Sequence, residues 1–271
     1  MEQLKRVTSA LIILPPFLCF LLYTTSEFFL AMVLFLTALS LREYFRMLDL
    51  SQCPVQPRIS YLLSFLLVCS AYFRASFWLP LITFFTIAAL TLNAIITGQS
   101  DPHRFTALLH NLFGVFFIAW SLSHLVLLRN LPEGKSYVLF LCAIVWVGDT
   151  CAMYIGKMIG RHKMSPSVSP GKTWEGAAGG LIGSLITAAV VSSYLIPQFS
   201  LLQCLLLALL LSIAAQISDL GESMIKRYTG FKDSGELIPG HGGLLDRIDS
   251  LLFAAPTFVY MLKFLNQGLP F

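Results

Sequence analysis

The sequence is poor in charged residues and has no long polar stretch. Charged side chains make up 12% of the 271 residues and hydrophobic ones 56%, whereas about a quarter of an ordinary soluble domain is charged. No polar segment is long enough to bury a core of its own. These shortages exclude a soluble globular domain. Apolar runs of about 18 residues or more recur instead, and each could cross about 30 Å of hydrocarbon as a helix.

Several familiar motifs are also absent. None of the six cysteines falls in a CxxC or Cys/His spacing, so we expect neither a zinc site nor a disulfide framework. The chain has no low-complexity tract and no convincing internal repeat, which argues against a transporter built from inverted repeats. A Walker motif is missing too, because Pro166 stands where Gly171-Lys172-Thr173 would need its first glycine.

The hydropathy pattern predicts an all-α, polytopic membrane bundle that forms a single domain over residues 1–271. We expect N-terminal spans in 1–140 and a second half, 141–271, that carries the polar motifs. The nine predicted spans are about 7–25, 27–48, 59–73, 77–97, 105–128, 136–156, 174–196, 199–225 and 246–265. The first follows two basic residues, as a signal peptide does. Pro15-Pro16 and the lack of a small-x-small cleavage site favour a retained helix.

The distribution of Lys and Arg predicts how these spans are oriented. With the N-terminus in the cytoplasm, 14 of the 18 Lys and Arg residues fall on the cytoplasmic side and four on the other. This asymmetry favours a cytoplasmic N-terminus in the cell (inner or plasma) membrane. The two long polar loops, about 157–173 and 227–245, then lie on the cytoplasmic side, where nucleotides and Mg²⁺ are available.

Acidic residues concentrate in the second half, where eight of the 14 follow position 148. Five of them have apolar sequence on both sides: Asp149, Asp219, Glu222, Asp246 and Asp249. On a helix, Asp219 and Glu222 would share one face with Ser223 and Lys226. Carboxylates at this depth are costly unless they are paired or bind cations. Pairing with Lys226, Arg227 and Arg247 would explain one or two of them, and the whole set favours a Mg²⁺ site open to phosphate oxygens.

The polar loops supply the opposite charge. Arg161, Lys163 and Lys172 alternate with Ser and Thr before a helix expected to begin near Trp174, and a helix N-terminus is a ready anion site. A plain basic loop is an equally good interpretation of this segment alone. In the second loop, the glycines of PGHGG (239–243) allow the backbone to approach a ligand closely. His241 would either donate to a phosphate or cap the loop.

Together these residues resemble those of the CDP-diacylglycerol synthases, also called phosphatidate cytidylyltransferases. The family signature is matched by Ser223, Lys226-Arg227, Lys232-Asp233, Pro239-Gly240-His241-Gly242-Gly243, Asp246-Arg247 and Asp249. A second family block is matched by Asp149, Thr150, Ala152, Tyr154, Gly156, Gly160, Ser169, Pro170, Lys172, Thr173, Trp174, Glu175 and Gly176. The blocks cover 149–250, and the first 140 residues resemble the family only in hydropathy. Ser218 departs slightly from the family, which often has glycine there.

The resemblance implies a reaction in which CTP and phosphatidic acid give CDP-diacylglycerol and pyrophosphate. It also implies Mg²⁺, a second monovalent cation (K⁺), membrane lipids as partners and a homodimer, with no nucleic acid. The residues expected to be catalytic are Lys172, Lys226, Arg227, Lys232, His241 and Arg247. Those expected to bind substrate are Ser169, Thr173, Ser223, Gly242 and Gly243. Those expected at the metal are Asp219, Asp246, Asp249, Glu222 and Asp149, with Asp219 and Asp246 holding Mg²⁺ directly.

Two other functions fit parts of the sequence. A CTP-dependent lipid kinase, such as a polyprenol kinase, also needs a membrane, CTP and Mg²⁺, but it transfers the γ-phosphate to an alcohol and releases CDP. An ion-coupled transporter also carries intramembrane acids. The transporter does not account for PGHGG beside basic residues on one side of the membrane, and the full signature favours the synthase over the kinase.

Overall fold

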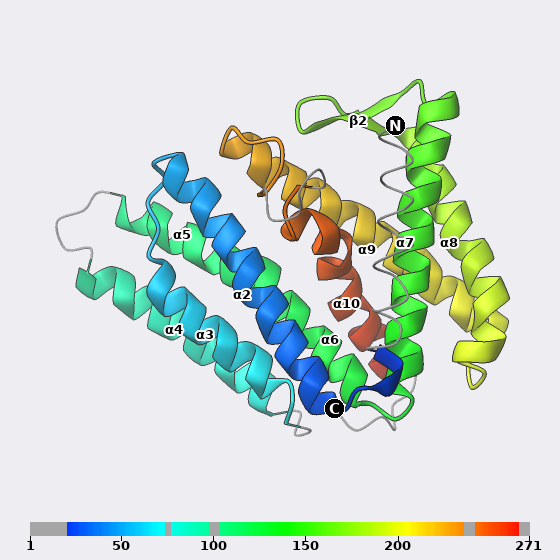
Figure 1. Cartoon of the computed structure of the whole chain (residues 1–271), viewed down its shortest axis with the longest axis horizontal. Coiled ribbons are helices and arrows are strands. Elements are labelled where there is room, and N and C mark those ends of the chain that lie inside the picture. The colour runs from blue at the N-terminus through cyan, green and yellow to red at the C-terminus, as the bar shows by residue number, and fades with distance from the viewer. Residues whose placement is uncertain (1–20, 74–76, 98–102, 236–241, 266–271) are drawn as a thin grey trace.

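The computed structural model describes residues 21–73, 77–97, 103–235 and 242–265. In this part of the chain it is a bundle of helices with one short β-hairpin (Figure 1). The N-terminal half forms α2 (Ser26–Leu50), α3 (Pro57–Ser70), α4 (Trp78–Thr97), α5 (Arg104–Gly114), η1 (Val115–Trp120) and α6 (Ser121–Asn130). The C-terminal half forms α7 (Gly134–Ile159), β1 (Lys163–Ser165), β2 (Ser169–Thr173), α8 (Trp174–Leu195), α9 (Leu201–Tyr228) and α10 (Leu245–Leu265).

The predicted spans correspond closely to these helices. Seven of the described helices are long and apolar enough to cross a membrane, with α5, η1 and α6 counted as one continuous span, Arg104–Asn130. The predicted span 59–73 is α3, whose 14 residues extend about 21 Å, less than the hydrocarbon thickness. The predicted span 7–25 lies largely outside the described residues. The chain is therefore a multi-span helical membrane protein.

Local sequence signals explain where several helices begin. Pro57 occupies the first turn of α3, where its missing N–H costs nothing. Ser200 and Gln203 form a capping box at the start of α9. The hydroxyl of Thr173 accepts the Gly176 N–H at 3.1 Å and so caps α8. The last of these caps joins the hairpin directly to a spanning helix.

Helices α2, α6 and α10 lie between two groups, α3–α5 on one side and α7–α9 on the other (Figure 1). One continuous core of buried apolar side chains extends from α2 to α10. Within it, α7 and α8 approach closely because small residues face each other: a Cβ on Gly180 would lie 2.9 Å from Ala152 Cβ and 3.0 Å from the Gly148 carbonyl oxygen. Such packing is a common way for membrane helices to associate.

Several segments that are distant in sequence meet at one end of the bundle. The ends of α2 and α9, the start of α10 and the β1–β2 hairpin all lie there (Figure 1). The Ser51 hydroxyl donates to the Thr229 carbonyl at 2.6 Å, which connects the end of α2 to the end of α9. The Arg227 Nε donates to the Val168 carbonyl at 3.1 Å, which connects α9 to the hairpin. This end carries nearly all of the motif residues.

Candidate functional site

Three carboxylates from two helices form a compact group at this end of the bundle. Asp219 and Glu222 come from the last turns of α9, and Asp249 comes from the second turn of α10. One oxygen from each lies within 4.8 Å of the other two. Asp219 and Glu222 share a helix face, as their spacing predicted. We call Asp219, Glu222 and Asp249 the acid triad.

Burial makes this arrangement expensive without a cation. Glu222 is fully buried, and Asp249 is 9% exposed. Neither Glu222 oxygen makes a hydrogen bond within the described residues, although Lys226 contacts one of them as an ion pair. Converging, desolvated carboxylate oxygens are the ligands that hard divalent cations prefer. The residues present therefore fit Mg²⁺.

Asp149 approaches the acid triad from α7. It interacts electrostatically with Asp219, Asp249 and Lys172, and its side chain hydrogen-bonds to Ser250. Its oxygens do not belong to the group that converges within 4.8 Å. This position suits a residue that orients the acid triad.

Asp246 has a different environment from the acid triad. Its Oδ1 lies 2.6 Å from Lys226 Nζ. Its Oδ2 accepts hydrogen bonds from Ser234 N at 2.9 Å, Ser234 Oγ at 2.9 Å and Gly243 N at 2.8 Å. The structure thus groups Asp219 with Glu222 and Asp249, whereas the sequence paired it with Asp246 as the direct ligands. In this structure Asp246 holds Lys226 and the loop that precedes α10.

Lys226 links these two sets of acids. Its ammonium group contacts Glu222, four residues earlier on α9, and Asp246 on α10. The lysine side chain is only 12% exposed. A cation held between two carboxylates in a poorly hydrated place is fixed in position.

Lys172 brings a second positive charge from the hairpin. Its Nζ lies 2.7 Å from Asp219 Oδ2 but makes no hydrogen bond of good geometry with the described residues. The ammonium nitrogen is itself buried, and Asp219 is its ion-pair partner in this structure. Lys172, Lys226, the acid triad and Asp246 form one cluster of alternating charge.

The hairpin that presents Lys172 is anchored at both of its ends. Glu175, on the first turn of α8, accepts the backbone N–H groups of Arg161 and His162 at 3.1 and 3.2 Å, and its Oε1 lies 2.6 Å from His162 Nδ1. Strands β1 and β2 pair antiparallel, with Lys163 opposite Thr173. The segment between Arg161 and Thr173 thus returns on itself as a hairpin whose base is closed by Glu175.

The other predicted site residues lie around this cluster. Ser223 is nearly buried on α9, next to Glu222, and Ser169 lies half-buried at the start of β2. Arg227, Lys232 and Arg247 are exposed. Thr173 is buried and its hydroxyl caps α8, so in this structure it serves the helix rather than the open site. His241 lies outside the described residues.

The glycines of the loop before α10 have specific conformations. Gly242 has a φ of +78°, a conformation that side chains with a Cβ rarely adopt. Gly243, which was expected to bind substrate, donates its N–H to Asp246. The loop is therefore held by the protein's own carboxylate.

Two residues in contact with this loop were missed by the sequence analysis. Ser234 is buried and its hydroxyl contacts both Asp246 and Glu43. Glu43, on α2, is 3% exposed. Glu43 could have been noticed because a glutamate within a predicted spanning segment is unusual, but the sequence suggested no partner for it.

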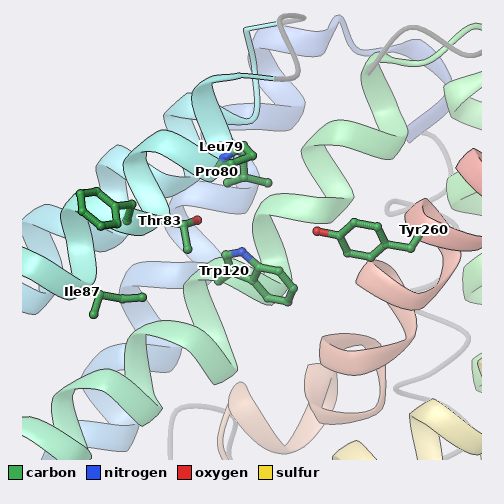
Figure 2. A pocket seen from close by; sticks show the side chains of 7 residues that line it. Leu79, Pro80, Thr83, Ile87, Trp120 and Tyr260 are labelled. Atoms are coloured by element: carbon green, nitrogen blue, oxygen red, sulfur yellow. The ribbon is translucent and has the colours of Figure 1, made fainter.

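The structure also has an apolar cavity away from this cluster. Its volume is about 340 Å³, and it is lined by Leu79, Pro80, Thr83, Phe84, Ile87, Trp120 and Tyr260. Figure 2 shows Thr83, Trp120 and Tyr260 around it, on α4, η1 and α10. Tyr260 is 11 residues beyond Asp249 on α10, which places it about 16 Å along the helix. The cavity lacks charged residues and is separate from the candidate site.

Comparison with known proteins identifies a family that matches nearly the whole chain and relatives that match part of it. A family model described as "Cytidylyltransferase family" matches residues 4–265. YnbB of Escherichia coli K12, described as an uncharacterized protein, is 43% identical over 182 residues, which cover 63% of this chain and 60% of YnbB. The phosphatidate cytidylyltransferase of Bacillus subtilis is 40% identical over 150 residues (54% of this chain, 55% of the relative). That of Staphylococcus saprophyticus is 38% identical over 181 residues (64% and 70%). The matched segments thus span little more than half of the first two relatives.

Proposed function

Because the chain belongs to the cytidylyltransferase family, we propose that it condenses CTP with phosphatidic acid to give CDP-diacylglycerol and pyrophosphate. Two similar proteins carry the name phosphatidate cytidylyltransferase. The observation that carries the proposal is the charge cluster itself. Two lysines are ion-paired to acids at one end of a membrane bundle, where a soluble nucleotide and a lipid headgroup could meet.

The reaction needs positioning more than proton transfer. A phosphate oxygen of phosphatidic acid forms a bond to the α-phosphorus of CTP, the bond from that phosphorus to the bridging oxygen breaks, and pyrophosphate leaves with the electron pair. The nucleophile is already an anion, so no general base is required. The main obstacle is repulsion between two polyanions, which fixed positive charges relieve.

The chain's own residues would meet this need as follows. Lys172 and Lys226 would neutralise phosphate oxygens from fixed positions, and the exposed Arg227, Lys232 and Arg247 would attract CTP to this end of the bundle. The acid triad would hold Mg²⁺, which when bound supplies positive charge to the nucleotide phosphates. Asp149 and Asp246 would keep the acid triad and Lys226 in place.

Location and assembly belong to the same proposal. The excess of Lys and Arg on one side supports a cytoplasmic position for the charge cluster and for the N-terminus. We retain K⁺ as a second cation and a homodimer as expectations from the family resemblance. The charge cluster lies at one end of the spanning helices. A lipid whose tails remain in the bilayer would present its phosphate at that end.

One assay tests the proposal against the kinase alternative. Purified protein in detergent is given phosphatidic acid and CTP labelled at the γ position, with and without Mg²⁺. Labelled pyrophosphate together with CDP-diacylglycerol is the expected result. In a parallel reaction with a polyprenol in place of phosphatidic acid, release of CDP with a labelled lipid would indicate the kinase, and a lack of turnover with both lipids would contradict both enzymes.

A further inference from the structure

A buried glutamate from the N-terminal half contacts the loop before α10. The Glu43 carboxylate accepts hydrogen bonds from Leu244 N at 2.9 Å, Leu245 N at 2.8 Å and Ser234 Oγ at 3.1 Å. Glu43 is only 3% exposed. Its carboxylate therefore depends on these three donors to compensate for the loss of hydration. All three donors belong to the loop or to the start of α10, and Glu43 lies 201 residues before Leu244.

Glu43 and Asp246 both hold the same loop. The Ser234 hydroxyl lies 3.1 Å from a Glu43 oxygen and 2.9 Å from an Asp246 oxygen, so its single proton serves one or the other. The N–H of Gly243 goes to Asp246, and the next two N–H groups go to Glu43. Two carboxylates thus satisfy three consecutive donors at the N-terminus of α10, where the helix dipole favours negative charge.

Two glycines leave the space that the Glu43 carboxylate fills. A Cβ on Gly235 would lie 2.7 Å from Glu43 Oε1, and a Cβ on Gly243 would lie 2.6 Å from Glu43 Oε2. Both distances are shorter than atoms in real structures tolerate. The loop backbone therefore requires glycine at both positions in order to close around this carboxylate.

We propose that Glu43 is a positioning residue that fixes residues 232–235 and the first turn of α10, and through them the position of Asp246 and Lys226. Its effect on turnover rests on the proposed function, whereas its effect on the loop does not. Glu43 acts through Ser234 and the α10 backbone, and it contacts neither Lys172 nor the acid triad in the described contacts.

The test compares Glu43→Gln with Asp49→Asn, an exposed acid on the same helix. Glutamine keeps the volume and one acceptor oxygen but presents an NH₂ group to the remaining donors. We expect kcat to fall about 10- to 100-fold, with a much smaller change in KM for CTP. Ser234→Ala should also lower kcat, and the double variant should be little slower than the slower single one, because the two residues act as a unit. Asp49→Asn should match the wild type.

A second readout needs no activity. Lys232 is exposed beside the loop, and trypsin cleavage after it, followed by mass spectrometry without substrates, reports how firmly the loop is held. Faster cleavage in Glu43→Gln, but not in Asp49→Asn, is expected. Unchanged cleavage would overturn the proposal. Faster cleavage with an unchanged kcat would show that Glu43 holds the loop but does not affect turnover.

The two readouts also separate this proposal from the proposed function. If the wild type makes no CDP-diacylglycerol, the proposed function fails, and the cleavage pattern still decides whether Glu43 holds the loop. If Glu43→Gln cannot be purified as a folded protein, Gly235→Ala, which pushes the carboxylate away, takes its place in both measurements.

Discussion

The Lys172 ammonium group lies 2.7 Å from Asp219 Oδ2, so the hairpin strand β2 is in contact with the last turns of α9. Each of the two side chains is partly exposed, at 24% and 31%. The Lys172 nitrogen itself is buried, so an anion that enters the cluster reaches it only when one of these two side chains shifts.

Replacing Lys172 by alanine should lower kcat/KM for CTP about 100- to 1000-fold, the usual effect of losing one fixed stabilising group. Lys163→Ala provides the control, because Lys163 is an exposed lysine on the same hairpin. Transfer of label from α-labelled CTP into lipid measures both variants. Equal activity of the two variants would show that Lys172 has no special role.

Changing Asp249 to asparagine should raise the Mg²⁺ concentration that gives half-maximal activity. The acid triad loses one of its three converging carboxylates, and we expect a shift of about 10- to 100-fold. Binding can also be measured without turnover, because Mg²⁺ should raise the melting temperature of the wild type more than that of Asp249→Asn. Asp49→Asn should respond as the wild type does. Identical Mg²⁺ responses in all three proteins would refute a cation site at the acid triad.

Lys226→Met should destabilise the protein by about 3–5 kcal/mol in the absence of Mg²⁺, because Glu222 would lose its ion-pair partner while fully buried. Adding Glu222→Gln should recover much of this loss. Adding Asp246→Asn should not, because Asp246 keeps three hydrogen-bond donors from Ser234 and Gly243. Thermal unfolding in detergent measures the three variants, and activity should stay low in all of them. If Glu222→Gln and Asp246→Asn restored stability equally, Glu222 would not be the carboxylate that depends on Lys226.

Gly180→Leu should lower the melting temperature by separating α7 from α8. A Cβ at this position would already lie 2.9 Å from Ala152 Cβ, and overpacking of this kind costs about 1–3 kcal/mol. Gly171→Leu is the matched control, because no atom lies within 4 Å of a Cβ added there. Similar melting temperatures for the two variants would mean that the interface between α7 and α8 yields easily.

The sequence predicted the spans well because the length of an apolar run determines whether a helix can cross a bilayer. The helices α2, α4 and α7–α10 each correspond to one predicted span. The predicted span 59–73 corresponds to α3, whose 14 residues are shorter than the hydrocarbon thickness. The relative placement of helices could not be read from hydropathy, because lipid-facing and protein-facing surfaces are both apolar.

The candidate site could be predicted only where its geometry is local. The spacing of Asp219, Glu222 and Lys226 placed them on one helix face, and the structure brings them together. The pairing of Lys172 with Asp219 depends on how the hairpin folds over α9, which spacing does not reveal. Glu43 was missed for the same reason, because all three of its hydrogen-bond partners lie near the other end of the chain.

The contact between Glu43 and Leu244 also has a consequence for how the protein is made. The two residues are 201 positions apart, and at about 5–20 residues per second a ribosome needs roughly 10–40 s to travel between them. During that interval α2 carries a carboxylate whose hydrogen-bond donors do not yet exist. A chain that includes the start of α10 is therefore the earliest product of translation in which Glu43 can bind all three of its hydrogen-bond donors.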